Sequence, residues 1–138
     1  MSEINRANSF VTFVNKHKDQ METVRYDRFV SRLFKADTYD QMFNHAVLGI
    51  CGEAGELADA IKKHVHYRKP LDRENVIEEL GDIFFYLHAL MNLIGVTEQE
   101  VLNANAVKLS NRYSDPTYSD EAAIARADKL VQETPPNG

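Results

Sequence analysis

Two long stretches of helical periodicity, at about residues 38–66 and 73–93, constrain the fold of this chain more than any other feature. In the first stretch, apolar residues recur every three or four positions, at Phe43, Val47, Ile50, Ala54, Leu57, Ile61 and Val65. This spacing places them along one face of an α-helix, so we predict a regular buried stripe. Thr38 or Asp40 begins this helix, and we expect it to end near His66.

The second stretch is apolar almost all round. Asp72, with Asn75 as the alternative, is the expected N-cap, and Gly95 follows the expected end of the helix. Pro70 interrupts the linker between the two helices. A helix that is apolar on every side must be buried on every side, and in a small chain a second subunit is the simplest cover. We therefore expect a homodimer or a homotetramer.

Shorter helices are predicted on both sides of this pair. They cover about residues 7–19, 98–113 and 121–131, and Thr97 with Glu100 forms a capping box at the start of the second of these. No strand candidate is longer than three residues. With 138 residues, the chain is predicted to form a single all-α domain, 1–138. We expect a compact antiparallel bundle of four to five helices, completed by oligomerisation, with a frayed tail at 131–138.

Composition excludes several classes of function. The formal net charge of −5 argues against a surface that binds nucleic acid or an anionic membrane. No apolar run has the length of a membrane span, and the N-terminus lacks the apolar core of a signal peptide. A single cysteine, Cys51, agrees with a reducing compartment. We expect a cytoplasmic protein.

Each of the two long helices carries a pair of carboxylates. Glu53 and Glu56 lie three residues apart on the first helix, and Glu79 and Asp82 on the second. Residues three apart share a helix face, and helices joined by a short linker are antiparallel neighbours. One such pair alone would be ordinary on a solvated face. Two pairs that converge beside apolar stripes predict a site for Mg²⁺, which prefers hard oxygen ligands.

Other chemistries fit the spacing less well. A carboxylate-bridged di-iron bundle needs Glu-x-x-His on two helices, and none of the five histidines has a Glu three residues before it. His64 and His66 lack a third ligand with the spacing of a zinc site. The chain has no Walker-type glycine loop and no Gly-x-Ser-x-Gly elbow. Cys51 adjoins the apolar stripe and is expected in the core rather than as a nucleophile.

The segments GEAGELADAIKK and ENVIEELGDIFFYL resemble the MazG-type nucleoside triphosphate pyrophosphohydrolases, the all-α NTP pyrophosphatases. The resemblance covers about residues 43–130. The family pattern of Glu-x-x-Glu, a variable spacer and then Glu-x-x-Asp maps onto the two acid pairs, with 22 residues between Glu56 and Glu79. Its downstream pattern, Asn-x-x-Lys-x-x-x-Arg, matches Asn105, Lys108 and Arg112. Glu78 neighbours Glu79, but helical phase points Glu78 away from the stripe.

The resemblance implies hydrolysis of a nucleoside or deoxynucleoside triphosphate to the monophosphate and pyrophosphate. It implies Mg²⁺, with Mn²⁺ as a possible substitute, held by Glu53, Glu56, Glu79 and Asp82. Glu53 or Glu56 would activate the attacking water. Asn105, Lys108 and Arg112 would bind the substrate. Three alternatives stay open: a dUTPase-like enzyme, a phosphoribosyl-ATP pyrophosphohydrolase, and a non-catalytic helical module that binds nucleotides or oligomerises.

Overall fold

A computed structural model describes residues 11–12, 14–16, 23–113 and 117–130. In these ranges the chain is helical and contains no strand, which confirms the all-α class. Among the described residues from Thr23 onward, six helices follow one another: α2 (Thr23–Leu33), α3 (Tyr39–Val65), α4 (Arg73–Ile94), α5 (Glu98–Arg112), α6 (Asp120–Ala125) and α7 (Ala127–Leu130). The first predicted helix covers about residues 7–19. Its described residues, 11–12 and 14–16, are helical, and its other residues lie outside the described ranges. The fold divides into an N-terminal unit, Met1–Gly95, and a C-terminal unit, Val96–Gly138.

The ends of α3 and α4 lie where the sequence predicts them. The Thr38 hydroxyl accepts a hydrogen bond from the Gln41 amide at 3.4 Å and caps α3. The Asp72 carboxylate accepts one from the Asn75 amide at 3.1 Å and caps α4. Gly95 ends α4 with a φ of 71°, a left-handed conformation that glycine adopts without strain.

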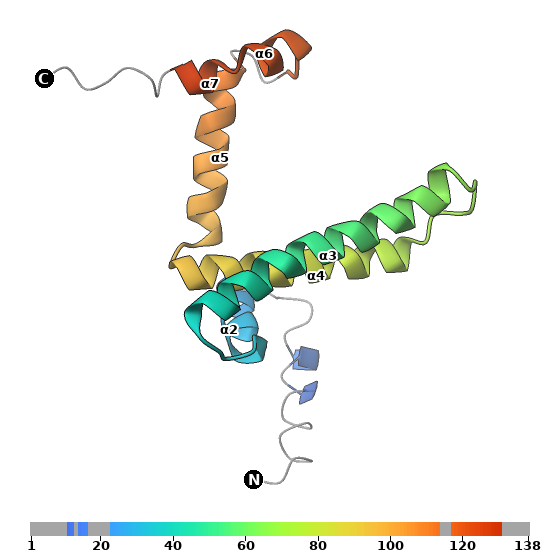
Figure 1. Ribbon diagram of the computed structural model, residues 1–138, viewed down its shortest axis with the longest axis vertical. Helices are drawn as coiled ribbons and strands as arrows, with labels where there is room; N and C mark the ends of the chain where they lie inside the picture. The colour runs from blue at the N-terminus through green and yellow to red at the C-terminus, as the bar shows by residue number, and fades with distance from the viewer. Residues whose placement is uncertain (1–10, 13, 17–22, 114–116, 131–138) are drawn as a thin grey trace, which may run out of the picture. The chain divides into compact units, whose positions relative to one another are not determined.

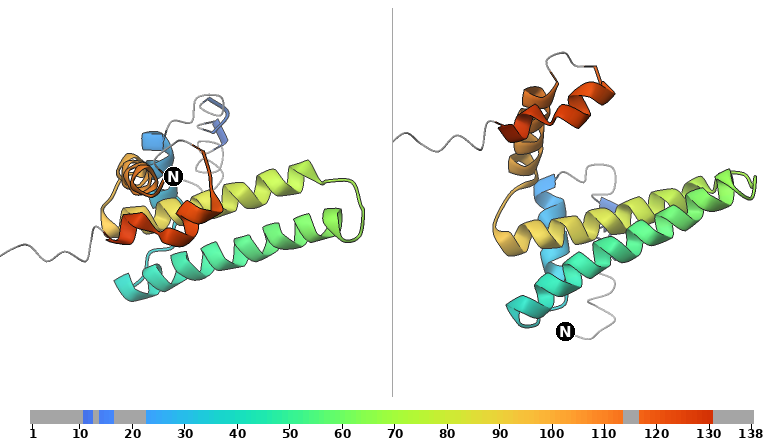
Figure 2. Two further views of the ribbon diagram at one scale, coloured as in Figure 1. Left: turned by 90° about the horizontal axis from the view of Figure 1, so that it is seen from above. Right: turned by 45° about the horizontal axis from the view of Figure 1, so that its top comes forward.

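The N-terminal unit is built on a hairpin of α3 and α4, which run side by side along their length (Figures 1 and 2). Small residues let the two helices approach closely. At Gly49, a Cβ atom would overlap the ring of Tyr86 on α4. Ala46 and Ala60 are the buried residues of α3. The hairpin is therefore held by contacts of backbone and small side chains with larger residues of α4.

α2 crosses one side of this hairpin (Figure 2). Its Val30 is fully buried and forms the core with Ala46 of α3 and Ala89 of α4. The side chain of His88 is hydrogen-bonded to Asp27 of α2 and is only 2% exposed. His88 is therefore a buried residue with a polar partner.

The C-terminal unit contains α5, α6 and α7. The predicted capping box is present, since Thr97 and Glu100 bond to each other's backbone amides. The single helix predicted at 121–131 is instead two helices. Arg126 separates them with a φ of 49°, in the left-handed region that breaks helical hydrogen bonding.

Two expectations about burial are wrong for a single chain. Val47, Ile61 and Val65 of the predicted buried stripe are 40%, 39% and 59% exposed. Cys51 is also exposed, although it was expected in the core. These positions lie about 100° or more around α3 from the residues that contact α4, because each residue advances about 100° around a helix. Within the described part of the chain, no single helix is long and apolar enough to cross a membrane; α4 and α5 meet that test only as a bent pair.

Candidate metal centre

Three of the four predicted acids converge between α3 and α4. Carboxylate oxygens of Glu53, Glu56 and Glu79 all lie within 4.8 Å of one another. Glu53 and Glu56 come from successive turns of α3, and Glu79 comes from the second turn of α4. The antiparallel hairpin thus brings together residues that are more than twenty positions apart in the sequence.

Burial and mutual repulsion shape the protonation of this cluster. Glu79 is only 7% exposed, Glu53 is half-buried and Glu56 is exposed. Loss of hydration, followed by the charges of Glu56 and Glu53, raises the pKa of Glu79. Loss of hydration, then the charges of Asp82 and Glu56, raises the pKa of Glu53, and a hydrogen bond with Glu79 partly opposes this. Without a cation, the cluster favours retention of a proton.

Asp82 lies at the edge of the cluster. Its side chain is exposed and is not one of the three that converge within 4.8 Å. Its charge nevertheless acts on the other acids, because it contributes to the raised pKa of both Glu53 and Glu79. Glu78, the neighbour of Glu79, is exposed and does not belong to the cluster. Helical phase accordingly separates the two adjacent glutamates, as expected.

The donor set fits a hard divalent cation. All three groups offer carboxylate oxygens, which Mg²⁺ and Mn²⁺ prefer to nitrogen or sulfur. Oxygens around one Mg²⁺ at about 2.1 Å are at most about 4.2 Å apart. The carboxylate oxygens here, all within 4.8 Å of one another, have a spacing close to that of ligands to a single ion. A cation would also offset the like-charge repulsion that raises the two pKa values.

The three predicted substrate-binding residues lie on α5 in the C-terminal unit. Asn105 and Lys108 are exposed. Arg112 instead makes a two-pronged ion pair: its Nε and Nη2 donate to the two oxygens of Asp128 at 2.7 and 3.1 Å. Asp128 is 6% exposed, and the hydrogen bonds from Arg112 hold its pKa below the usual range. The ion pair with Asp128 fixes the orientation of the Arg112 guanidinium through Nε and Nη2. The N–H groups of Nη1 do not take part in this ion pair.

The sequence reasoning missed Asp128 and Tyr26. Asp128 lies sixteen residues from its partner in a short helix, so no helical spacing links the two. Tyr26 of α2 packs edge-on against His88, with ring centroids 4.9 Å apart. Burial, and then the charge of Asp82, raises the pKa of the Tyr26 hydroxyl. α2 therefore brings the hydroxyl of Tyr26 within the electrostatic range of Asp82.

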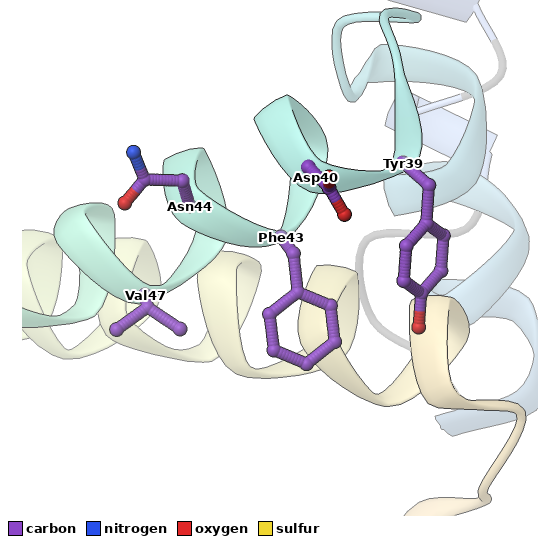
Figure 3. A pocket seen from close by; sticks show the side chains of 5 residues that line it. All are labelled: Tyr39, Asp40, Phe43, Asn44 and Val47. Atoms are coloured by element: carbon purple, nitrogen blue, oxygen red, sulfur yellow. The ribbon is translucent and has the colours of Figure 1, made fainter.

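A shallow hollow of about 490 Å³ lies along the first turns of α3. Tyr39, Phe43 and Val47 project to the same side of the helix there (Figure 3), and Asp40 and Asn44 complete the lining. The lining is mostly apolar and contains none of the clustered acids. The hollow is therefore separate from the acidic cluster on the same helix.

Comparison with known proteins places this chain in a family. The model of the MazG nucleotide pyrophosphohydrolase domain matches residues 41–116, which is more than half of the chain. The chain belongs to the MazG nucleotide pyrophosphohydrolase family. All four acids and the three α5 residues lie inside the segment that matches the MazG domain.

The gene 37 protein of Mycobacterium phage L5 is a similar protein, 32% identical over 73 residues. The matched part is 50% of this chain and 64% of the phage protein, so the match spans less than two thirds of that relative. No solved structure matches the chain.

Proposed function

We propose that this MazG-family protein is a Mg²⁺-dependent nucleotide pyrophosphohydrolase that converts a nucleoside or deoxynucleoside triphosphate into the monophosphate and pyrophosphate. The observation that carries the proposal is the convergence of Glu53, Glu56 and Glu79 within 4.8 Å. A cluster of three carboxylates, one of them nearly buried, repels any anion until a cation is bound. A triphosphate that carries a divalent metal ion brings the cation that offsets the repulsion between its phosphates and these carboxylates.

Glu53, Glu56 and Glu79 would hold the Mg²⁺ ion, with Asp82 as a further ligand at the edge of the cluster. Mn²⁺, which takes similar oxygen ligands, would substitute for it. The bound ion supplies charge neutralisation for the phosphate oxygens and polarises the phosphorus atom that is attacked. The exposed Glu56 can adjust to the substrate, whereas the nearly buried Glu79 has a restricted position.

In the reaction, water attacks the α-phosphorus of the nucleotide. Glu53 or Glu56 accepts the proton of this water. The bond between the α-phosphorus and the bridging oxygen then breaks, and pyrophosphate leaves. Lys108 and Arg112 bind phosphate oxygens, with Asn105 as a further contact to phosphate or sugar. The Asp128 carboxylate positions Arg112 by holding two of its donors. We assign this reaction to the cytoplasm.

The test is turnover of the eight common ribo- and deoxyribonucleoside triphosphates with Mg²⁺, with Mn²⁺ and with a chelator. We expect pyrophosphate release with either metal and none with the chelator. In ¹⁸O-labelled water, the label should appear in the nucleoside monophosphate, since attack at the β-phosphorus would label pyrophosphate instead. If no nucleotide is turned over with either metal, the protein is a binding module and the proposed reaction is wrong.

Two adjacent glutamates provide a matched pair of variants. Glu79→Gln should abolish turnover while leaving the helical circular dichroism intact. Glu78→Gln removes the same charge from the exposed neighbouring position and should keep nearly full activity. Equal losses in the two variants would show that overall charge matters rather than the position of Glu79 in the cluster.

A further inference from the structure

The loop between α3 and α4 carries a positive patch in an acidic chain. This loop is the end of the hairpin that lies away from α2 (Figure 1). Residues 62–74, which include the loop and the helix ends beside it, contain five cations and two acids, whereas the formal net charge of the whole chain is −5. All seven charged residues are exposed. The patch is therefore open to a negatively charged partner.

Ion pairs within the protein occupy only two of the five cations. Asp59 pairs with Lys62 at 3.1 Å and with Lys63 at 2.8 Å. The carboxylate of Asp72 is taken up by its cap of α4, because it accepts a hydrogen bond from the Asn75 amide. Three cations have no ion pair within the part of the chain that the structure describes, and we call them the loop cations: Arg68, Lys69 and Arg73.

Hydrogen bonds fix the path of this loop. The amide of Lys69 donates to the carbonyl oxygen of Lys63 at 3.3 Å. Nδ1 of His64 lies 2.8 Å from the carbonyl oxygen of Lys69, and it is the donor because a carbonyl can only accept. A loop that is already ordered loses less conformational entropy when it binds a partner.

The backbone of Arg68 is strained. Its φ is 53°, in the left-handed region that residues other than glycine seldom adopt. Glycine would occupy this position without strain. The chain instead places a long cationic side chain here, at the point where the loop leaves α3. Strained backbone of this kind is found where a side chain serves binding or catalysis, so the conformation of Arg68 indicates a function for the loop.

An aromatic ring lies among the cations. Tyr67 is 60% exposed, and Nζ of Lys62 lies 5.8 Å from the centre of its ring. Cations that bind phosphates beside an exposed ring that stacks on a base are typical of sites for single-stranded nucleic acid. An acidic protein segment has no base to stack on the ring. A small ligand prefers a concave pocket, whereas this loop forms the end of a hairpin.

We propose that the α3–α4 loop binds single-stranded nucleic acid, with the loop cations on its phosphates and Tyr67 stacked on a base. The proposal goes beyond the proposed reaction and does not depend on it. The net charge of the chain argues against binding over the whole surface, and the loop is a local exception to it.

Salt screening lets such a local patch act. Charges more than about 8 Å apart are largely screened at physiological ionic strength. Of the clustered acids, Glu79 is six residues after Arg73, about 9 Å along the axis of α4, and Glu56 is farther from the end of α3. The acidic cluster therefore does little to cancel the attraction between the loop cations and a phosphate backbone.

The test is the binding of a fluorescently labelled oligothymidylate to the full chain, followed by fluorescence anisotropy in the presence of a chelator. The chelator prevents a metal ion from joining the phosphates to the acidic cluster, so the result is independent of the proposed reaction. We expect binding at low salt. The logarithm of the association constant should fall with the logarithm of the salt concentration with a slope of about −2, since each phosphate contact contributes about −0.7. Absence of binding at low salt would overturn the proposal.

Matched variants locate the binding surface. Lys69→Gln removes one loop cation, and Lys35→Gln removes an exposed cation outside the loop. We expect Lys69→Gln to weaken binding several-fold and to make the salt slope shallower by about 0.7. Lys35→Gln should change neither quantity. Equal losses in the two variants would show that only the net charge matters, which would refute a site at the loop.

Arg68→Gly separates binding from stability. It removes a loop cation and relieves the left-handed backbone, so binding should weaken several-fold while the urea midpoint of unfolding stays the same or rises. Unchanged binding by Arg68→Gly would contradict the functional reading of this strained residue.

Tyr67 tests the class of partner. Tyr67→Ala should weaken binding at least about five-fold, and Tyr67→Phe should keep it, because stacking needs the ring and not the hydroxyl. Full binding by Tyr67→Ala would show a general site for polyanions and overturn the assignment to nucleic acid. Binding of vesicles that contain phosphatidylserine, with no binding of the oligonucleotide, would make the loop a membrane contact instead.

Discussion

The approach of α3 and α4 at Gly49 makes a sharp prediction about stability. A Cβ atom at this position would overlap the aromatic ring of Tyr86. Gly49→Ala therefore forces the ring to rotate or the helices to separate. Overpacking of this kind costs about 1–3 kcal/mol. In an exposed helix, by contrast, replacing glycine with alanine gains about 1 kcal/mol of helix propensity.

Two other glycines of the same helix are the controls. Nothing lies within 4 Å of a Cβ atom built at Gly52 or at Gly55. Gly52→Ala and Gly55→Ala should thus stabilise the protein by up to about 1 kcal/mol. Gly49→Ala should be less stable than either control by about 1–3 kcal/mol, the overpacking cost alone.

The assay is urea unfolding followed by circular dichroism, at one protein concentration so that any assembly contributes equally. Gly49 is one helical turn from Glu53, and Tyr86 is one turn from Asp82. Separation of the helices at this point should therefore also weaken the effect of Mg²⁺ on the unfolding midpoint. If Gly49→Ala is as stabilising as Gly52→Ala, the close approach of the two helices is wrong.

Three further predictions concern ionisable and buried groups. The pKa of Glu79 is raised above its ordinary 4.5, so the folded protein holds this proton more tightly than the unfolded chain does. The metal-free protein should therefore lose stability as pH rises through the raised pKa. Thermal unfolding with a chelator measures this dependence, and Glu79→Gln should flatten it. His88→Ala removes the buried partner of Asp27 and should lower the free energy of unfolding in urea by about 1–3 kcal/mol. An unchanged free energy of unfolding would contradict the role of this pair in holding α2 against α4. The pKa of Asp128 is lowered below its ordinary 3.8 by Arg112, so the pair should stabilise α7 above that pH and fail as pH falls through the lowered pKa. Hydrogen exchange of α7 should show this acid-dependent loss in the wild type, and Asp128→Asn should show faster exchange already at neutral pH.

The sequence by itself determined the class of fold and the ends of its main helices. Heptad-like spacing fixed α3 and α4, and local hydrogen-bonding groups such as Thr38, Asp72 and Gly95 fixed where they begin or end. These features depend on neighbours within about four residues, which the sequence displays directly. The same helical phase separated Glu79 from Glu78.

Contacts between distant residues were decided only by the tertiary structure. Helical spacing placed Glu53 and Glu56 on one face, but the register of α3 against α4 brought Glu79 within 4.8 Å and left Asp82 at the edge. The pairing of Arg112 with Asp128 depends on the break at Arg126 that divides α6 from α7.

Burial also required the tertiary structure. An apolar stripe shows which side of a helix avoids water, but the pattern is the same whether the cover comes from the same chain or from a second copy. α4 is apolar on three sides. α3 and α2 contact two of them, and the side with Ile77, Leu80 and Phe84 is exposed. The sequence alone therefore predicted that α4 needs a partner on every side. The packing of α2 and α3 decided which side of α4 is exposed.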